Sequence, residues 1–276
     1  MLLEPQTIQD KLIINKDSKK CFVFDLDGTI IFQGKKLSLV NEAILKKIID
    51  HGHEVIFATG RSGFDTDFVL PKWCNSLART LFNGGLSISR DGEIVRDIYL
   101  PIPNIIEIND ICLRYRYPFT VDGLSHYHNA PIDHKIFKKT TEYQMARSYE
   151  SSLDRLLLSK VYKILILDMS AYNEFSLYAK DNRLVIKHHS YDACFDLVPE
   201  CCSKYAGIKS LVNSYKNEDV FVFGNDFNDY EMLLAFNNSI LFGDIKELQL
   251  ICKINIPYNE HLCNNFKQII EIILAV

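Results

Sequence analysis

Residues 21–29, CFVFDLDGT, constrain the fold of this chain more than any other stretch. The run CFVF is uninterrupted and apolar, as in a parallel strand covered on both faces, and the chain turns acidic where the run ends. Asp25 and Asp27 are two positions apart, so an extended backbone would turn both carboxylates to the same side, and Gly28 allows a sharp turn after them. Ligands of open α/β sheets bind at the carboxyl ends of strands. The stretch therefore predicts an active-site strand that carries two carboxylates.

Two neighbouring carboxylates repel each other, and they stay ionised together if a hard divalent cation lies between them. Mg²⁺ prefers one or two carboxylates together with phosphate oxygens and water. Asp25 and Asp27 are therefore a candidate Mg²⁺ site. An ordinary Asp-Gly turn after a strand would have the same local sequence, so the decision depends on the motifs that follow.

Three further segments place polar residues at the end of a strand or the start of a helix. Residues 54–58, EVIFA, predict a buried strand that ends in Thr59-Gly60-Arg61, where a hydroxyl and backbone N–H groups can bind a phosphate oxygen. Lys204 stands at the start of a helix expected to reach residue 215, so its ammonium and the helix N-terminus would act on the same anion. Residues 219–223, DVFVF, predict another buried strand, which continues into GNDFND at 224–229.

In this order, DLDGT, TGR, SKYAG and GNDFND resemble the four motifs of the haloacid dehalogenase superfamily of phosphatases. The resemblance implies that Asp25 is the nucleophile and Asp27 the acid/base, with Thr59 and Lys204 as the other catalytic residues. The residues it implies for substrate binding are Thr59, Gly60, Arg61, Lys204 and Asn228. The metal would be Mg²⁺, and its expected ligands are Asp25, Asp27, Asn225, Asp226 and Asp229.

The fourth motif departs from the family pattern, which is commonly GDxxND. Asn225 takes the place of the usual first Asp, and Asp226 follows it directly. The spacing favours Asn225 as the metal ligand, but Asp226 could ligate if the loop shifted by one residue. Asp229 would orient Lys204 or bind the ion through water. The choice between Asn225 and Asp226 stays open at this point.

Between the second and third motifs the sequence texture changes. Residues 86–99 predict a hairpin with Asp91-Gly92 at its tip, and short helices and strands alternate irregularly up to residue 198. An insertion here resembles the C2-type cap of the Cof-like, class IIB branch of the superfamily. The expected fold class is α/β, with a Rossmann-like doubly wound parallel sheet in residues 1–84 and 199–276 and an inserted α+β cap in 85–198. Residues 1–19 form an N-terminal extension to which no function is assigned.

The resemblance implies that Asp25 attacks phosphorus to give an aspartyl-phosphate, which water then hydrolyses while the cap selects a small sugar phosphate. Candidate cap contacts are Tyr117, His126, Tyr127 and His128. The pairs His51/His53 and His188/His189 are expected to be surface histidines, since no Cys or carboxylate cluster accompanies them. Two alternatives stay open: a phosphohexomutase of the same superfamily, and a non-catalytic sugar-phosphate-binding protein.

Composition limits the partners that this chain can have. The chain has 276 residues, of which 47% are hydrophobic and 24% are charged, as in a soluble globular protein, and its net charge of −4 argues against nucleic acid as a partner. Eight cysteines without CxxC spacing, and no secretory signal or apolar span, predict reduced thiols in a cytoplasmic protein that does not bind a membrane. The expected partner is a small phosphorylated molecule, and the oligomeric state is left open.

Overall fold

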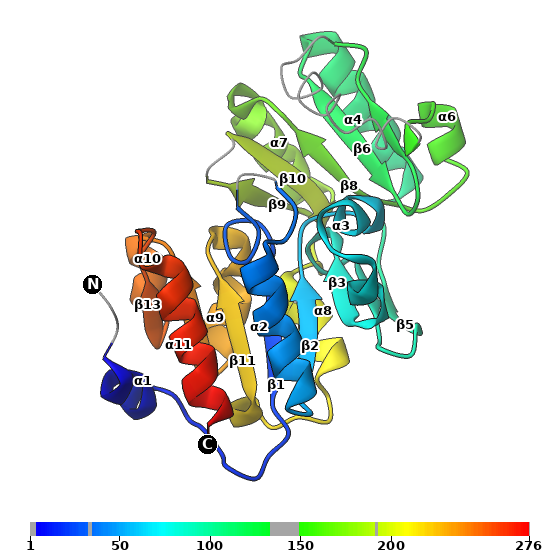
Figure 1. Ribbon diagram of the computed structural model, residues 1–276. Coiled ribbons are helices and arrows are strands. Elements are labelled where there is room, and N and C mark those ends of the chain that lie inside the picture. Colours follow the sequence, from blue (N-terminus) through cyan, green and yellow to red (C-terminus); the bar gives the residue numbers. More distant parts are fainter. Residues whose placement is uncertain (1–3, 33–34, 133–148, 191–192, 276) are drawn as a thin grey trace.

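The computed structural model describes residues 4–32, 35–132, 149–190 and 193–275, and these residues form two β-sheets. The strands of the larger sheet are β1 (Cys21–Phe24), β2 (Glu54–Ala58), β3 (Ala78–Leu81), β4 (Leu86–Ile88), β5 (Ile94–Asp97), β11 (Val220–Gly224), β12 (Asn238–Phe242) and β13 (Ile254–Ile256). Their order is β13-β12-β11-β1-β2-β3-β4-β5, and the strands from β13 to β3 run parallel to one another. The motif-bearing strands β1, β2 and β11 therefore lie side by side at the centre of the sheet (Figure 1).

Helices cover both faces of the larger sheet, as the fully buried strand β1 requires. On one face lie α1 (Pro5–Lys11), α2 (Leu39–Asp50) and α11 (Leu262–Leu274), which pack against Phe22 and Phe24. On the other lie α8 (Lys204–Leu211), α9 (Tyr230–Ala235) and α10 (Lys246–Gln249), which pack with Cys21 and Val23. Alternate residues of one strand thus belong to two separate apolar clusters, as expected for a strand buried on both faces.

The N-terminal extension belongs to this core. Ile8 of α1 is fully buried in the cluster that also contains residues of α11, and α1 packs against that helix. Beyond α1, the backbone N–H of Ile13 donates to Oδ1 of Asn238, and Nδ2 of Asn238 donates to the carbonyl of Ile13, at 2.7 and 2.9 Å. The extension is therefore fixed to the first residue of β12.

The hairpin of residues 86–99 lies in the larger sheet, although it was expected to begin the inserted domain. β4 and β5 are antiparallel, and β4 pairs with β3 in a register that sets Leu86 opposite Leu81. The short 3-10 helix Phe82–Gly84 reverses the chain at once after β3, so β4 satisfies the backbone groups on the open edge of β3. The reversal ends β3 at Leu81, because the next residue, Phe82, has a positive φ of 52°.

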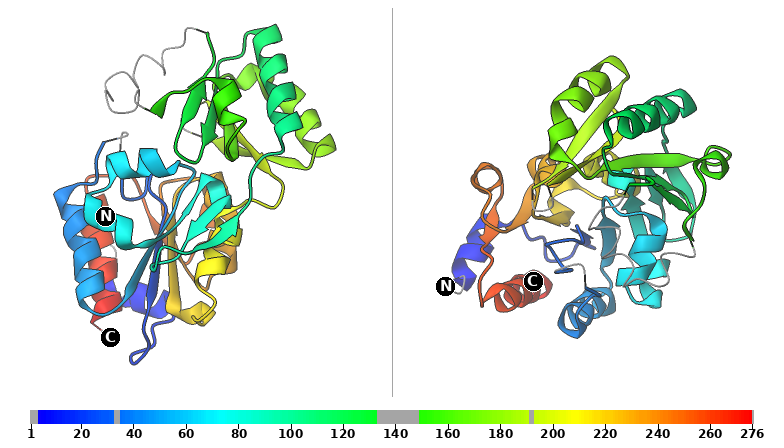
Figure 2. Two further views of the ribbon diagram at one scale, coloured as in Figure 1. Left: turned by 90° about the vertical axis from the view of Figure 1, so that its right-hand side faces the viewer. Right: turned by 90° about the horizontal axis from the view of Figure 1, so that it is seen from above.

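The second sheet is antiparallel and has one face covered by helices. Its strands, in spatial order, are β7 (Tyr127–Asn129), β6 (Phe119–Gly123), β8 (Val161–Ile166), β10 (Cys194–Pro199) and β9 (Leu184–His189). Helices α4 (Ile102–Tyr115) and α7 (Tyr172–Asp181) bury one face of it, and the short α6 (Leu153–Leu156) lies near β7. The opposite face is turned towards the carboxyl ends of β1 and β2 (Figures 1 and 2). We propose that residues 98–199, rather than 85–198, form the inserted cap.

Serine side chains start three helices of the core. Ser38, Ser62 and Ser203 accept hydrogen bonds from the third residue after them, and they begin α2, α3 (Gly63–Val69) and α8. The cap of Ser203 fixes Lys204 as the first residue of its helix. That helix ends at Leu211 instead of near residue 215, since Asn213 and Ser214 favour turns over helix interiors.

Two structural findings bear on the environment of the protein. None of the helices in the described ranges is long and apolar enough to cross a bilayer. The eight cysteines all lie in described residues, and each is a free thiol.

Candidate active site

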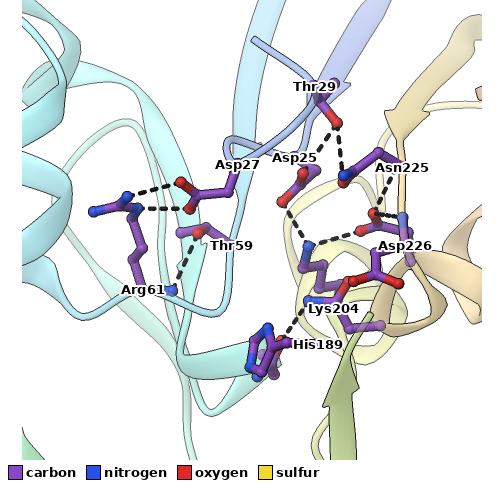
Figure 3. Close-up of polar contacts among 12 residues, drawn as sticks. Asp25, Asp27, Thr29, Thr59, Arg61, His189, Lys204, Asn225 and Asp226 are labelled. Atoms are coloured by element: carbon purple, nitrogen blue, oxygen red, sulfur yellow. Dashed lines mark hydrogen bonds and ion pairs between the residues drawn. The ribbon is translucent and has the colours of Figure 1, made fainter. Parts of the chain in front are cut away.

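Four of the predicted site residues meet where the central strands end. Asp25 follows β1, Thr59 follows β2, Asn225 follows β11, and Lys204 is the first residue of α8. Since neighbouring parallel strands end at the same edge of a sheet, the topology alone brings three of these side chains together. Lys204 approaches from the helix side, and the cap lies above the whole group (Figures 1 and 3).

Lys204 lies between two buried carboxylates. Its Nζ donates to Oδ1 of Asp25 at 2.6 Å and to Oδ1 of Asp229 at 2.7 Å. Burial, together with the neighbouring Asp229 and Asp27, raises the pKa of Asp25 to about 7 against the opposing charge of Lys204. Burial lowers the pKa of Lys204, but the two carboxylates outweigh burial and hold that pKa above its ordinary value. The ammonium therefore stays charged beside Asp25.

The loop after β11 fixes Asn225 next to Asp25. Oδ2 of Asp229 accepts the backbone N–H groups of Asn225 and Asp226 at 2.8 and 3.1 Å. The hydroxyl of Thr29 donates to Oδ2 of Asp25 at 3.0 Å and lies 3.5 Å from Oδ1 of Asn225. Gly28 has a φ of +82°, and a Cβ there would lie 2.1 Å from Nδ2 of Asn225. Only glycine leaves room for this approach.

Asp27 is separated from Asp25 and paired with Arg61. Nε and Nη2 of Arg61 donate to the two oxygens of Asp27 at 2.6 and 2.7 Å, and the carboxylate turns away from Lys204 (Figure 3). The expectation that both carboxylates face the same side does not hold, because β1 ends at Phe24 and both residues lie in a loop without strand alternation. Burial raises the pKa of Asp27, but Arg61 outweighs it and holds that pKa below its ordinary value.

Thr59 and Gly60 lie beside this pair. The hydroxyl of Thr59 accepts the backbone N–H of Arg61 at 3.1 Å, and Thr59 is fully buried. A Cβ at Gly60 would come within 3.1 Å of the Asn83 side chain, whose Oδ1 accepts from Nδ2 of Asn228 at 3.3 Å. Gly60 and Asn228, both expected to bind substrate, are therefore neighbours of the same side chain, Asn83.

Asp226 is bound by the cap. Its Oδ1 accepts the hydroxyl of Ser190 at 2.5 Å, and its Oδ2 accepts the backbone N–H of Ser190 at 2.9 Å. Ser190 follows β9, so this contact joins the cap to the loop after β11.

Asp25 and Asn225 are the expected ligands that share a contact, since the Thr29 hydroxyl meets Oδ2 of Asp25 and Oδ1 of Asn225, while Oδ1 of Asp25 binds Lys204. Among the other expected ligands, Asp27 is engaged by Arg61, Asp226 by Ser190, and Asp229 by Lys204 and two backbone N–H groups. No group of three or more His, Cys, Asp and Glu side chains in the described part of the chain is placed to hold a metal ion. A carboxylate and an amide oxygen are hard donors, so they suit Mg²⁺ when phosphate and water supply the other ligands.

Several residues that contribute to the site were not predicted as site residues from the sequence. Thr29 is the last residue of the DLDGT motif, and Asn83 lies outside all four motifs. His189, expected on the surface, has only 24% of its side chain exposed and pairs with Asp196 of β10. Its alternation with Lys187 along β9 is the signal that could have placed it on the polar face of a half-buried strand.

Three of the four expected cap contacts have contacts to protein side chains or backbone. The Tyr117 hydroxyl donates to Glu174 of α7, on the helix-covered face. Tyr127 stacks on Phe64 of α3, with ring centroids 5.6 Å apart, and Nδ1 of His128 is bonded to the carbonyl of Ser151.

Comparison with known proteins gives one family and a consistent fold. A family model described as haloacid dehalogenase-like hydrolase matches residues 22–261. The HMP-PP phosphatase of Yersinia enterocolitica (serotype O:8, biotype 1B) is 23% identical over 239 residues, which are 80% of this chain and 82% of that protein.

Two solved structures illustrate the fold. A haloacid dehalogenase-like hydrolase from Bacteroides thetaiotaomicron has a TM-score of 0.76 at 19% identity, and the match covers 92% of this chain and 99% of the other. A HAD subclass IIB sugar phosphatase has a TM-score of 0.71 at 17% identity, and the match covers 87% of this chain and 94% of the other. The predicted fold class, an α/β core with an additional α+β part, is thereby confirmed.

Proposed function

Because this chain belongs to the haloacid dehalogenase-like hydrolase family, we propose that it is a Mg²⁺-dependent phosphomonoester hydrolase that forms an aspartyl-phosphate on Asp25. The resemblance to the Cof-like, class IIB phosphatases, noted from the motifs, is confirmed by the family match. Membership in a family of phosphatases leaves the metal, the substrate and the roles of single residues to be argued from this site.

The observation that carries the proposal is the position of Lys204 between Asp25 and Asp229. An ammonium within 2.6 Å of the Asp25 carboxylate favours its ionised form against the effect of burial and can stabilise the charge of an approaching phosphate. Asp229 fixes the ammonium and at the same time orders the loop of Asn225. A protein that only binds sugar phosphates needs neither a buried nucleophile nor this support.

The reaction has two steps. An Oδ atom of Asp25 attacks phosphorus, the P–O bond to the leaving alcohol breaks, and Asp27 gives its proton to the departing oxygen. Water then attacks the aspartyl-phosphate, Asp27 takes the proton of that water, and inorganic phosphate leaves with Asp25 regenerated. Thr59 and Lys204 hold the phosphoryl oxygens throughout.

The pairing of Asp27 with Arg61 fits the second step better than the first. A carboxylate bound by a guanidinium at 2.6 and 2.7 Å is ionised, as a base for water must be. To act as an acid, Asp27 must first take up a proton and leave Arg61. We expect the incoming phosphate to draw Arg61 away, since guanidinium groups bind phosphate through the same two parallel hydrogen bonds.

Asp25 and Asn225 would hold the Mg²⁺, which would supply charge to offset the approach of an anionic phosphate to an anionic nucleophile. The substrate class that we propose is a small phosphorylated metabolite, in particular a sugar phosphate. One relative is named as a phosphatase of HMP-PP and one solved structure as a sugar phosphatase, which supports this class.

The test is hydrolysis of 4-nitrophenyl phosphate by the full chain, with Mg²⁺, for the wild type and for Asp25→Asn. We expect the substitution to abolish turnover while the far-ultraviolet circular dichroism stays unchanged, because the amide keeps the shape of the carboxylate and cannot attack phosphorus. Asp91→Asn, at the exposed tip of the hairpin, is the control and should have wild-type activity. Turnover by a pure Asp25→Asn preparation would contradict the assignment. Release of an isomeric sugar phosphate from a hexose 1-phosphate, without free phosphate, would support the mutase instead.

A further inference from the structure

A row of charged side chains crosses the face of the cap sheet that is turned towards the core. The row consists of Asp122 of β6, Lys163 of β8, Asp196 of β10 and His189 of β9. Asp122 and Lys163 are direct cross-strand partners. Asp196 pairs with Leu165, which is two positions after Lys163 on the same strand. Asp196 also pairs with Lys187, and His189 is two positions after Lys187. Because alternate residues of a strand face the same side, all four belong to one face of the sheet.

The members of this row are bonded to one another and mostly buried. Nζ of Lys163 lies 3.4 Å from Oδ2 of Asp122 and 3.2 Å from Oδ1 of Asp196, and the three side chains are 8%, 7% and 0% exposed. Buried ion pairs of this kind rarely stabilise a fold more than apolar residues of similar size would. The opposite face of the same strands does carry such an apolar cluster. Stability alone therefore gives no reason for charges on the face above the site.

His189 is the member of the row that reaches accessible space. Its Nε2 is 2.9 Å from Oδ2 of Asp196, and that oxygen also accepts from Nδ2 of Asn83 at 2.8 Å. Its side chain is 24% exposed, whereas Asp196 is fully buried. In Figure 3 the ring lies below and between the Asp27–Arg61 pair on one side and Lys204 with Asp226 on the other. His189 is therefore placed where the part of a substrate beyond the phosphate has to lie.

Asp196 decides which hydrogen-bonding atom His189 presents. An ionised carboxylate can only accept a hydrogen bond, so Nε2 carries the hydrogen and Nδ1 is the atom left for a ligand. No hydrogen-bond partner of Nδ1 is found among the described residues. Nδ1 accepts a hydrogen bond when the ring is neutral and donates one when the ring is protonated. A hydroxyl group can form a hydrogen bond with Nδ1 in both protonation states, since it is both a donor and an acceptor.

We propose that His189 binds a hydroxyl group of the leaving alcohol, and that Asp196, held by Lys163 and Asn83, positions the imidazole for this contact. The inference rests on the proposed phosphatase function and narrows its substrate class to phosphate monoesters of polyhydroxylated alcohols. His189 is a specificity residue in this scheme, and Asp196 is a positioning residue. The phosphoryl group itself stays with Asp25, Thr59 and Lys204.

The neighbouring His188 provides a matched control. It is on the same strand but on the opposite face, where its ring meets Tyr172 of α7 edge-on with centroids 6.3 Å apart. His188 pairs with Phe195, a member of the apolar cluster under the helices. A histidine of the same strand, one residue away, therefore differs from His189 mainly in the side that it faces.

The experiment measures kcat and KM of the full chain for 4-nitrophenyl phosphate, whose leaving group has no further hydroxyl, and for glucose 6-phosphate, ribose 5-phosphate and glycerol 3-phosphate. The variants are His189→Phe, which keeps a ring and removes both nitrogens, His189→Gln, which keeps hydrogen-bonding groups, and His188→Phe. For the best of the three hydroxylated esters, His189→Phe should lower kcat/KM roughly 10-fold to 100-fold, mainly through KM, because a polar contact is lost. His189→Gln should recover part of this loss.

The same His189→Phe variant should change kcat/KM for 4-nitrophenyl phosphate less than about threefold, and His188→Phe should leave the ratio between the two substrates unchanged. Equal losses on both substrates, or no loss on either, would overturn the role of His189. A wild-type chain that hydrolyses 4-nitrophenyl phosphate but none of the hydroxylated esters overturns this inference and leaves the proposed function standing. Hydrolysis of no ester at all overturns both.

Discussion

The core and the cap each contain a buried lysine between two aspartates, and the two trios differ in how tightly they are held. In the core, Lys204 donates to Asp25 and Asp229 at 2.6 and 2.7 Å. In the cap, Lys163 lies 3.4 and 3.2 Å from Asp122 and Asp196. Burial raises the pKa of one aspartate in each trio, Asp25 and Asp122, to about 7.

The difference lies in the supporting contacts. The core trio is assembled from loop ends and a helix start, and Asp229 also accepts two backbone N–H groups. The cap trio is built from residues in regular strands, and its outer contacts are side chains, those of Asn83 and His189. A site fixed by the backbone suits chemistry, which tolerates little displacement. A site fixed by side chains on strands suits recognition, because single members can change without moving the chain.

The largest expected effect separates the two lysines. Lys204→Met should lower kcat for 4-nitrophenyl phosphate about 1,000-fold or more, since the charge beside Asp25 is lost. Lys163→Met should keep kcat within about tenfold, although both variants lose roughly 3–5 kcal/mol of stability because two buried carboxylates lose their partner. Kinetics and urea unfolding measure the two quantities on the same samples. If folded Lys163→Met is as inactive as Lys204→Met, the division between chemistry and recognition is wrong.

The next effect concerns the cation site beside the core trio. Asn225→Asp should lower the Mg²⁺ concentration for half-maximal activity roughly tenfold, because a carboxylate adds charge where an amide has none. Asp226→Ala should change that concentration little, since its oxygens already bind Ser190. Titration of Mg²⁺ at fixed pH and ionic strength compares the variants. The opposite pattern, with a steep rise for Asp226→Ala, would make Asp226 the ligand, and activity that resists a chelator would exclude the metal-dependent mechanism.

A pH-dependent effect is expected from the cap trio. The raised pKa of Asp122, about 7, means that the folded state binds this proton more tightly than the unfolded state does. Its contribution to stability is therefore present at low pH and is lost as pH rises from the unfolded value towards 7. Asp122→Asn should remove this dependence and stabilise the protein at pH 8, relative to the wild type, by on the order of 1–2 kcal/mol.

Urea unfolding at pH 5.5 and pH 8 provides the measurement for Asp122. The control is Asp154→Asn in the exposed first turn of α6, which should change the stability equally at both values of pH. A wild-type stability that rises between pH 5.5 and 8, with Asp122→Asn following in parallel, would show that Asp122 is ionised throughout.

The smallest effect is expected where the two regions touch. Ser190→Ala removes the hydroxyl that Asp226 accepts at 2.5 Å but keeps the backbone contact of the same residue. We expect KM for the best hydroxylated ester to rise about twofold to threefold, with kcat unchanged, because one contact between the cap and the core is lost. Ser125→Ala, in the exposed turn between β6 and β7, should have no effect. A loss in kcat instead would mean that Ser190 orders the loop of Asn225.

The sequence predicted the core of the site well and its surroundings poorly. The apolar runs of β1, β2 and β11 place Asp25, Thr59 and Asn225 at the carboxyl-terminal edge of the sheet. This placement follows from the parallel strand order alone and does not depend on side-chain conformations. The partner of Asp27, Arg61, and the contact of Asp226 with Ser190 depend on rotamers and on where the cap lies, and neither is periodic in the sequence. The hairpin of β4 and β5 was assigned to the cap from its antiparallel pattern. Such a pattern does not distinguish a hairpin that extends a parallel sheet from one that begins a new sheet.

The contact between α1 and α11 joins two segments that are far apart in the sequence, and this separation affects folding during synthesis. Ile8 is buried against residues of the last helix, and Ile13 is bonded to Asn238 of β12. Ile13 and Asn238 are 225 positions apart, so the surface that receives α1 is synthesised long after α1 itself. Helix α1 can therefore reach its final packing only after α11 has been synthesised.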